Sequence, residues 1–509
     1  MTVPSSPSEK QSTLGPYVPT LILHGGAGSI SRATLPPELY ARYHASLLEY
    51  LTKTRDLLVS GATALDAACY AVTLFEDDPL FNCGRGAVFT DQGTIEMEAS
   101  VMVCSVNPAG PPAGSIKRGA AVSLVRNTRH PILLAKEVLV AADDSGGLGG
   151  TNSMHCHLSG RKLEEWGWKE KQLESKPDQW FWTKKRWEEH RRGLRPKPSD
   201  SYTFNDLLAS VDPFSPPPHD DELGDLDVNE IPSQGTVGAV CLDSWGNLAV
   251  ATSTGGLTNK KAGRIGDTPT IGSGFWAESW EEDVPASAET YPGCQPGTFD
   301  LATDSFVKRI WTGASDWLRP CLSLFEAQRG YRLLRLCDSP PPYSSLDATT
   351  HGPYNPPYPP IAAIRKRHRA VAMSGTGNGD SFLRTNAVRT AASICRFSSL
   401  SSHSLADAVA TIAGPNGELQ RSAGDRWGRT GEGQGGIIGI EVIDCNYGDE
   451  TEEADVDWSK NSIVRKEKKK AGKAVFDFNC GGMFRAYYEA GGNGDGDERA
   501  MVMVFKEEY

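Results

Sequence analysis

The spacing of apolar residues along the chain predicts a mixture of helices and strands. A short apolar run at residues 21–23 predicts a buried strand, and we interpret His24 and the glycines after it as a tight packed turn. Apolar residues at helical spacing follow over 38–59, and a second, alanine-rich helix is predicted from Thr63, a suitable N-cap, up to Pro79. Further strands are predicted at residues 119–127, 236–243, 246–254, 370–375, 435–444 and 473–478. The pattern therefore predicts helices packed on sheets in layers.

Three segments do not have the pattern of a buried core. Residues 195–233 combine prolines with acids, residues 280–368 contain proline-rich stretches, and residues 446–472 pair an acidic run with a basic one. We interpret the first as a flexible linker, the second as an insertion, and the third as an insertion that forms a solvated hairpin loop. A length of 509 residues permits one large domain with such insertions or two domains, and we expect a single catalytic domain overall.

Charge and composition narrow the class of protein. A net charge of −12 and a pI near 5.4 argue against nucleic-acid binding and favour small polar substrates. The sequence has no apolar run long enough to span a bilayer and does not begin with a secretory signal pattern, so a cytoplasmic location is expected. Its eleven cysteines lack paired metal-ligand spacing, so we expect free thiols and no catalytic metal.

The stretch 233–269 carries the strongest chemical signal, because Thr236, Thr254, Arg264 and Asp267 occur together in it. A hairpin followed by a glycine-rich loop explains the alternation of the stretch but not this set of side chains. Taken singly, the threonines are ordinary strand residues, and the arginine and aspartate suggest a surface ion pair.

A threonine at a newly made N-terminus supplies both a nucleophile and a base. Its free α-amine has a pKa of about 7.7–8.0, is partly neutral near pH 7, and lies within reach of its own hydroxyl. The bond between Gly235 and Thr236 must break first, and a glycine before the threonine permits strained dihedral angles while Thr236 Oγ1 attacks the preceding carbonyl. The linker at 195–233 places this bond where the chain can be cut without unravelling a core.

Six motifs in order resemble the plant-type asparaginase and isoaspartyl peptidase family of N-terminal-nucleophile hydrolases. They extend over most of the chain outside the three segments: LILHGGAGS, the block from ATALDAACYAV to IEMEASVM, VRNTRHPILLA, TVGAVCLD to GRIGDTP, SGTGNGDSFLR and FNCGGMFR. The resemblance implies an α+β fold, a four-layered αββα sandwich of the N-terminal-nucleophile hydrolase type. It also implies cleavage into an α chain of residues 1–235 and a β chain of residues 236–509, and a dimer of αβ heterodimers.

The resemblance implies a role for each residue of the 233–269 stretch. Thr236 is the nucleophile that cleavage after Gly235 exposes, and Thr254 on the neighbouring strand orients it by a hydrogen bond. Arg264 holds the α-carboxylate of the substrate through a two-pronged contact, and Asp267 holds its α-ammonium group.

Further roles fall outside that stretch. Thr376 and Gly377 match the family's oxyanion hole, and Gly274 and Gly379 are expected to let the substrate approach the backbone. Asn82 matches a family asparagine near the nucleophile and is expected to contact substrate. The stretch 75–85 matches a loop whose main-chain carbonyls hold a structural sodium ion in related enzymes, and no catalytic cofactor is implied.

The function implied is hydrolysis of the side-chain amide of L-asparagine and of β-aspartyl dipeptides, through an acyl-enzyme, to give L-aspartate. The run 378–380 also resembles glycosylasparaginases, and long insertions resemble threonine aspartases, although Asp267 argues against cutting inside a protein chain. An unprocessed, inactive relative that only binds a ligand or partner is the alternative from another class. The insertion at 280–368 acts as a lid, narrows the site or extends it for a larger substrate; the sequence leaves these three open.

Overall fold

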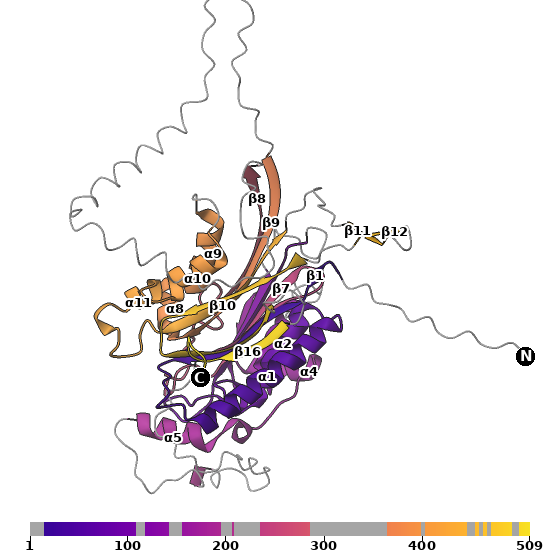
Figure 1. Cartoon of the computed structure of the whole chain (residues 1–509). Helices are drawn as coiled ribbons and strands as arrows, with labels where there is room; N and C mark the ends of the chain where they lie inside the picture. The colour runs from indigo at the N-terminus through magenta and orange to yellow at the C-terminus, as the bar shows by residue number, and fades with distance from the viewer. Residues whose placement is uncertain are drawn as a thin grey trace, which may run out of the picture. The chain divides into compact units, whose positions relative to one another are not determined.

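The computed structural model (Figure 1) describes part of the chain in detail. The described residues are 15–107, 118–141, 155–194, 206–207, 235–285, 364–398, 403–444, 454–457, 462–465, 470–490 and 498–509. The chain divides into two compact units, of which the first contains residues 1–284, 365–490 and 497–509 and the second 285–364 and 491–496. All the candidate site residues belong to the first unit.

An eight-stranded sheet forms the centre of the first unit. Its strand order is β16-β15-β2-β6-β7-β3-β4-β5, and all neighbours are antiparallel except β4 and β5. The two middle strands, β6 and β7, are buried along almost their whole length, so both faces of the sheet are covered there. The bounds are β2 Thr20–Gly28, β3 Met97–Ser105, β4 Arg118–Val125, β5 His157–Ser159, β6 Val237–Leu242, β7 Asn247–Thr254, β15 Gly482–Ala490 and β16 Glu498–Met503.

A second sheet of four strands packs against the first. Its order is β14-β10-β9-β8, and β10 and β14 contact β2 while β10 also contacts β6. Apolar side chains from both sheets form one cluster, in which Ile22 and Val240 meet Met373 and Ile438. The bounds are β8 Phe275–Pro285, β9 Ile364–Gly377, β10 Gly435–Asp444 and β14 Lys473–Phe478.

Helices cover each sheet separately. The helices α1 (Pro37–Val59), α2 (Ala64–Asp77) and α3 (Pro131–Ala141) contact strands of the first sheet, and α10 (Leu405–Ala413) contacts β10 and β14 of the second. Figure 1 shows α8 to α11 in orange, apart from α1 and α2 in indigo and purple. The remaining helices are α4 Arg161–Glu170, α5 Lys184–Gly193, α8 Gly379–Thr385, α9 Ala387–Phe397, α11 Glu418–Ser422 and the 3-10 turns η1 Gly84–Gly86, η3 Asp178–Phe181 and η6 Gly424–Arg426.

The helices near the N-terminus follow the sequence prediction. The first spans Pro37–Val59, and Thr63 caps the second by accepting a hydrogen bond from the Asp66 N–H. Small alanine side chains of α2 lie fully buried in the cluster that includes β6 and β7, which lets the helix pack closely on the sheet.

Other elements differ from the prediction. The expected turn after residue 23 is wrong, because β2 continues through Gly28. Its register with β15 shifts at Gly25, which has no partner residue on β15. The segment expected to begin at 280 starts later, since residues 280–285 belong to β8 and 364–368 to β9. In the two main sheets, five of the described strands were not predicted from the pattern: β3, β5, β8, β15 and β16.

Parts of the other two segments lie among the described residues. Within 446–472, β11 (Ala454–Asp457) pairs antiparallel with β12 (Ser462–Arg465), and β13 (Lys470–Ala471) pairs with β1 (Tyr17–Val18). The predicted linker at 195–233 lies outside the described residues except for 206–207. None of the helices that the structure describes has the length and apolar character needed to cross a membrane. Cysteines in the described ranges are free thiols, as predicted.

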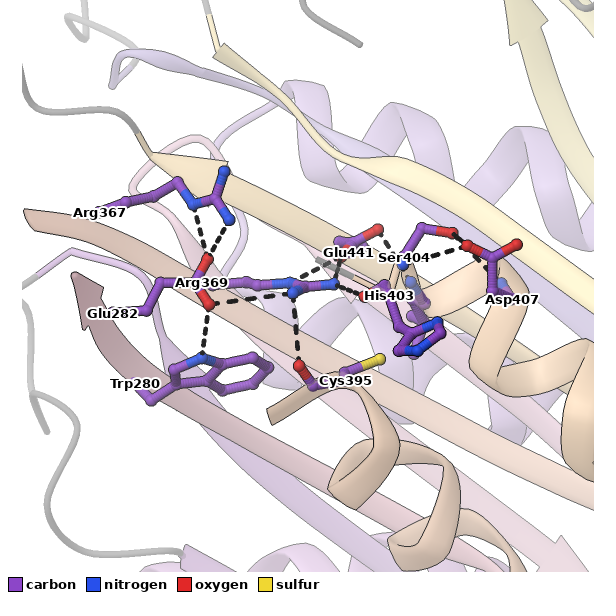
Figure 2. A network of polar contacts seen from close by, with 10 residues as sticks. Trp280, Glu282, Arg367, Arg369, Cys395, His403, Ser404, Asp407 and Glu441 are labelled. Atoms are coloured by element: carbon purple, nitrogen blue, oxygen red, sulfur yellow. Dashed lines mark hydrogen bonds and ion pairs between the residues drawn. The ribbon is translucent and has the colours of Figure 1, made fainter. Parts of the chain in front are cut away.

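A buried ion pair joins β9, β10 and the helices of the second layer (Figure 2). The Arg369 guanidinium donates to Glu441 through Nε at 2.8 Å and also through Nη2, which donates to the His403 carbonyl at 2.6 Å as well. The second Glu441 oxygen accepts from the Leu405 N–H at the start of α10. Arg369 is 1% exposed and Glu441 4%, so their charges are compensated by each other and by main-chain groups rather than by water.

We expect Glu441→Gln to destabilise the protein by about 3 kcal/mol, because it leaves buried Arg369 with only the more distant Glu282, 4.0 Å from Nη1, as a counter-charge. The shift of the urea-unfolding midpoint, with the chain kept whole by Thr236→Ala, measures this. Lys366→Ala is the matched control, since it removes an exposed ion pair from the same strand, β9, to Glu281 on β8. Such a pair contributes about 0–1 kcal/mol. A shift no larger than that of the control would contradict the expectation.

Candidate active site

The predicted nucleophile lies at the start of a central strand. Thr236 immediately precedes β6 and is 5% exposed. Val237 pairs with Ser253, so one further step of the register places Thr236 beside Thr254 at the end of β7. Both threonines thus come from the middle of the sheet, where the strands are held on both sides.

The hydroxyl that shares a hydrogen bond with the Thr236 side chain belongs to a residue that was not predicted from the sequence. Thr236 Oγ1 and Thr268 Oγ1 are 3.0 Å apart and share a hydrogen bond. The Thr254 hydroxyl accepts a hydrogen bond from the Gly256 N–H at 3.0 Å, which fixes its own position at the end of the strand. The signal for Thr268 was present in the sequence, because it directly follows Asp267 in the GDTP motif.

The predicted oxyanion donors flank the peptide between Gly235 and Thr236. Thr376 Oγ1, at the end of β9, donates to the Thr236 carbonyl at 2.8 Å. A Cβ added to Gly235 would lie 2.6 Å from Thr376 Oγ1 and 3.0 Å from the Gly377 nitrogen. Gly377 has φ +141°, and a Cβ there would collide with the Gln434 carbonyl, so a glycine is required at this position.

The predicted substrate clamp forms a compact charged group next to these threonines. Asp267 precedes Thr268 in the chain, and a Cβ added to Gly379 would lie 2.4 Å from Asp267 Oδ1 and 3.1 Å from Arg264 Nη2. Arg264 Nη2 also donates to Asp380 Oδ1 at 3.1 Å. The Asp380 side chain is about half exposed, whereas that of Arg264 is mostly buried. Both clamp residues therefore face the α-carbon of Gly379, which is where the sequence analysis expected the backbone to be approached.

Gly274 has a different reason to be a glycine. Its N–H donates to the Asp267 carbonyl at 3.1 Å, and an added Cβ would lie 2.6 Å from that oxygen. The close approach at Gly274 is thus made by the main chain of Asp267, and approach of a substrate to this backbone stays a prediction.

Burial dominates the electrostatics of the clamp. Asp267 is 5% exposed, its Oδ2 has no hydrogen-bond partner among the described residues, and burial raises its pKa to about 7 against the opposing effect of Arg264. Glu98 on β3 is fully buried opposite Thr254, and burial raises its pKa also; its Oε1 accepts from the Gly266 N–H at 2.8 Å. Burial lowers the pKa of Lys260, while Glu98 opposes that shift.

Glu98 and Lys260 were not identified from the sequence. The signal for Glu98 was a single acid inside the otherwise apolar run of β3. An acid in such a strand lies either at a solvent-facing edge or beside a buried positive charge. Here the buried charges are those of Lys260 and Arg264.

Asn82 holds main chain rather than facing the clamp. Its Nδ2 donates to the Gly256 carbonyl at 2.8 Å, and its Oδ1 accepts from the Val88 N–H at 3.1 Å. The Asn82 carbonyl accepts from the Gly255 N–H at 2.9 Å. Because Gly256 also donates to the Thr254 hydroxyl, Asn82 acts on the site through the turn that follows β7.

In the loop expected to hold a sodium ion, main-chain carbonyl oxygens lie close to two glycines. A Cβ added to Gly84 would lie 2.0 Å from the Glu76 carbonyl oxygen, and one added to Gly86 would lie 2.0 Å from that of Phe81 and 2.7 Å from that of Pro79. Hard main-chain oxygens gathered in this way fit a hard cation. No cluster of three or more His, Cys, Asp or Glu side chains suited to a metal occurs within the described ranges.

His24 lies next to the site but is neutral. It is fully buried, burial lowers its pKa to about 3, and its Nε2 shares a 2.6 Å hydrogen bond with Ser374 on β9. His24 pairs with Gly238, and a side chain at Gly238 would collide with both groups.

Comparison with known proteins identifies the class to which this fold and site belong. Residues 17–287 match the model of the family described as Asparaginase. A putative isoaspartyl peptidase/L-asparaginase of Dictyostelium discoideum is 37% identical over 264 residues, which are 50% of this chain and 70% of the relative. An isoaspartyl peptidase of Salmonella typhimurium is 34% identical over 259 residues (51% and 69%), and an isoaspartyl peptidase/L-asparaginase of Xenopus laevis is 34% identical over 264 residues (51% and 67%).

The protein is therefore a hydrolase. More particularly, the chain belongs to the asparaginase family that the sequence motifs indicated.

We expect Asp267→Asn to stabilise the protein above pH 7, by about 2–4 kcal/mol. A carboxyl whose folded pKa is raised to about 7 keeps its proton more readily in the folded state, so wild-type stability is lost as pH rises from 4 to 7. The neutral amide avoids that loss. Urea unfolding of both proteins from pH 4 to 8, each kept as one uncleaved chain by Thr236→Ala, should show a difference that grows up to pH 7 and then levels off.

The control is Asp91→Asn, because the hydrogen bond from Lys261 holds the pKa of Asp91 below its usual value. That substitution should not stabilise the protein as pH rises. If Asp267→Asn has the same effect at pH 4 and pH 8, the inferred cost of ionising Asp267 is wrong.

Proposed function

We propose that this chain is an autocatalytically processed threonine amidohydrolase. Its reaction is hydrolysis of the side-chain amide of L-asparagine and of β-aspartyl dipeptides to L-aspartate. One observation carries the proposal: Thr268, Thr376 and Gly377 gather around the 235–236 peptide, while Arg264 and Asp267 face Gly379 beside them. The names of the relatives in three organisms support the same substrates.

Processing is the first step. Thr236 Oγ1 attacks the Gly235 carbonyl carbon, the peptide C–N bond breaks, and the Thr236 nitrogen takes up the proton as the chain is transferred to the hydroxyl as an ester. Water then hydrolyses the ester and leaves a carboxylate on Gly235 and a free amine on Thr236. The Gly377 N–H lies beside Gly235, and the Thr376 hydroxyl, which donates to the Thr236 carbonyl, turns to the adjoining Gly235 oxygen as the oxyanion forms; loss of one such donor costs about 3–4 kcal/mol of barrier.

Hydrolysis of substrate repeats this chemistry on a bound amide. The free amine takes the proton from Thr236 Oγ1, which attacks the side-chain carbonyl; ammonia or an amine leaves, and water releases aspartate from the acyl-enzyme. Arg264 holds the α-carboxylate and Asp267 the α-ammonium group. Because Arg264 already bonds to Asp380, the substrate carboxylate must share or displace that contact. Thr268 orients the nucleophile by a hydrogen bond, and Thr254 orients it from the neighbouring strand. Thr254 is itself held by the turn after β7, which Asn82 fixes through Gly256.

The finer architecture belongs to the same proposal. Helices on the outer faces of two stacked sheets support a four-layered αββα sandwich of the N-terminal-nucleophile hydrolase type. The α chain then covers residues 1–235 and the β chain 236–509, with the αβ units paired as a dimer in the cytoplasm. Light scattering of the processed protein tests the dimer, and cell fractionation tests the location.

We expect the wild type to yield fragments that begin at Thr236, and Thr236→Ala to stay intact and inactive, because alanine has no nucleophilic oxygen. Mass spectrometry follows the cleavage while asparagine, a β-aspartyl dipeptide, a glycosylasparagine and a folded protein substrate are assayed.

Thr268→Val is expected to lower kcat by about 10- to 100-fold, because it removes the hydroxyl bonded to Thr236.

Each outcome has a separate meaning. Highest turnover of glycosylasparagine would favour a glycosylasparaginase, which the run 378–380 also resembles. Cleavage of the protein substrate would favour a threonine aspartase. A wild-type chain that stays whole and inert would leave only a binding role.

We also propose that a sodium ion sits against the carbonyls of Glu76, Pro79 and Phe81. Replacing sodium by tetramethylammonium in the buffer, at constant ionic strength, should lower the thermal midpoint by several degrees, because the larger cation cannot enter between these oxygens. Choline serves as a second large cation. An equal midpoint in all three buffers would argue against the ion.

A further inference from the structure

A buried arginine on helix α5 contacts the loop that contains Asn82. Arg186 is 2% exposed; its Nε donates to the Gly86 carbonyl at 2.8 Å, and its Nη1 donates to Glu189 at 2.9 Å. Its Nη2 is buried without a hydrogen-bond partner among the described residues. A buried guanidinium is stable only where its donors are satisfied, so the carbonyl of Gly86 is a principal anchor of this side chain.

The helix is built to present Arg186 inward. Thr183 caps its N-terminus by accepting from the Arg186 N–H at 3.3 Å, and Arg186, Trp187 and His190 form its buried face. Glu189 lies one turn along and is nearly buried as well, so the charge of Arg186 is compensated within the helix.

The loop at residues 79–88 connects Gly86, through a series of hydrogen bonds, to the strand end beside the nucleophile. Gly86 ends the turn η1, and two residues later the Val88 N–H donates to Asn82 Oδ1. Asn82 in turn bonds through Nδ2 and its carbonyl to Gly256 and Gly255. The Gly256 N–H holds the Thr254 hydroxyl, which the register places beside Thr236.

The same helix contacts the turn after β7 at a second point. Nδ1 of His190 shares a hydrogen bond with the Asn259 side chain, whose Nδ2 donates to the His190 carbonyl at 3.0 Å. Asn259 has a left-handed backbone with φ +58°, and its N–H donates to the Phe89 carbonyl. Residues before the 235–236 bond thus hold residues after it from two sides.

We propose that Arg186 is a positioning residue for amide hydrolysis. By holding Gly86 it fixes the loop at 79–88, and through Asn82 it fixes the main chain at 255–256 that orients Thr254. This inference rests on the proposed function of Thr236. It assigns no contact between Arg186 and substrate, so its effect falls on kcat rather than on KM.

The test uses the full-length chain, with Arg186→Ala and Arg186→Lys. Arg421→Ala is the matched control, since Arg421 is 62% exposed in a surface pair with Glu418. All variants are measured in the same sodium-containing buffer. We expect Arg186→Ala to lower kcat for asparagine about 100-fold with KM changed less than about threefold, because small misplacements of a reacting group have effects of that order.

Two further readouts separate positioning from general damage. Guanidinium ion at about 20 mM should restore at least about tenfold of the lost kcat in Arg186→Ala by filling the vacated site, and should not affect Arg421→Ala. Hydrogen exchange should become faster at the N–H groups of Val88, Gly255 and Gly256 in Arg186→Ala and remain unchanged in the control.

The results distinguish this inference from the proposed function. If the wild type is processed and active but Arg186→Ala keeps its kcat, or loses it without faster exchange at these three groups, the inference is overturned and the proposed function stands. If Arg186→Ala does not fold, Arg186→Lys decides. Lysine keeps the charge but cannot bond Gly86 and Glu189 in the same plane, and a lysine variant with wild-type kcat overturns the inference. A wild type without activity overturns the function itself.

Discussion

The antiparallel pairing of β6 with β7 is the interaction on which the rest of the site depends. These strands lie in the middle of the eight-stranded sheet and are buried on both faces; β6 begins directly after Thr236, and β7 ends at Thr254. A one-residue slip would turn one threonine away from the other and reverse every buried side chain, so the core itself enforces the register. The second sheet then brings Thr376 and Gly377 to the same end through the packing of β10 on β2 and β6.

Charge imposes the second constraint. Asp267, Glu98, Lys260 and Arg264 lie close together with little access to water, which is unfavourable in the absence of ligand. In the proposed function, the ammonium group of an amino-acid substrate is the partner for Asp267 Oδ2. The cost of burying these charges and the proposed affinity for an amino-acid head group thus have the same physical cause.

Much of this arrangement was predictable from the sequence, but not all of it. The helices α1 and α2, with the Thr63 cap, follow from periodicity and capping, and the family was identified from ordered motifs. Strand β3 was missed because a strand buried on both faces shows no alternation, and β8 because half of it lies in the 280–368 segment that the prolines indicated as an insertion. Thr268 stands in the GDTP motif, but its hydrogen bond to Thr236, like the bonds of Asn82 to main chain, joins segments far apart in the chain and has no local sequence signal.

The hydrogen bonds of Asn82 and His190 to residues 255–259 join the two sides of the 235–236 bond without any covalent link. In the proposed mature form those two sides are separate polypeptides, and β6 remains between β2 and β7 with its new end inside the protein. Unfolding of the mature form is then effectively irreversible. The precursor folds as a single chain, whereas the two unfolded mature chains must meet by diffusion before the sheet can form again. The lifetime of the mature molecule is accordingly set by how slowly it opens, and not by an equilibrium to which it can return.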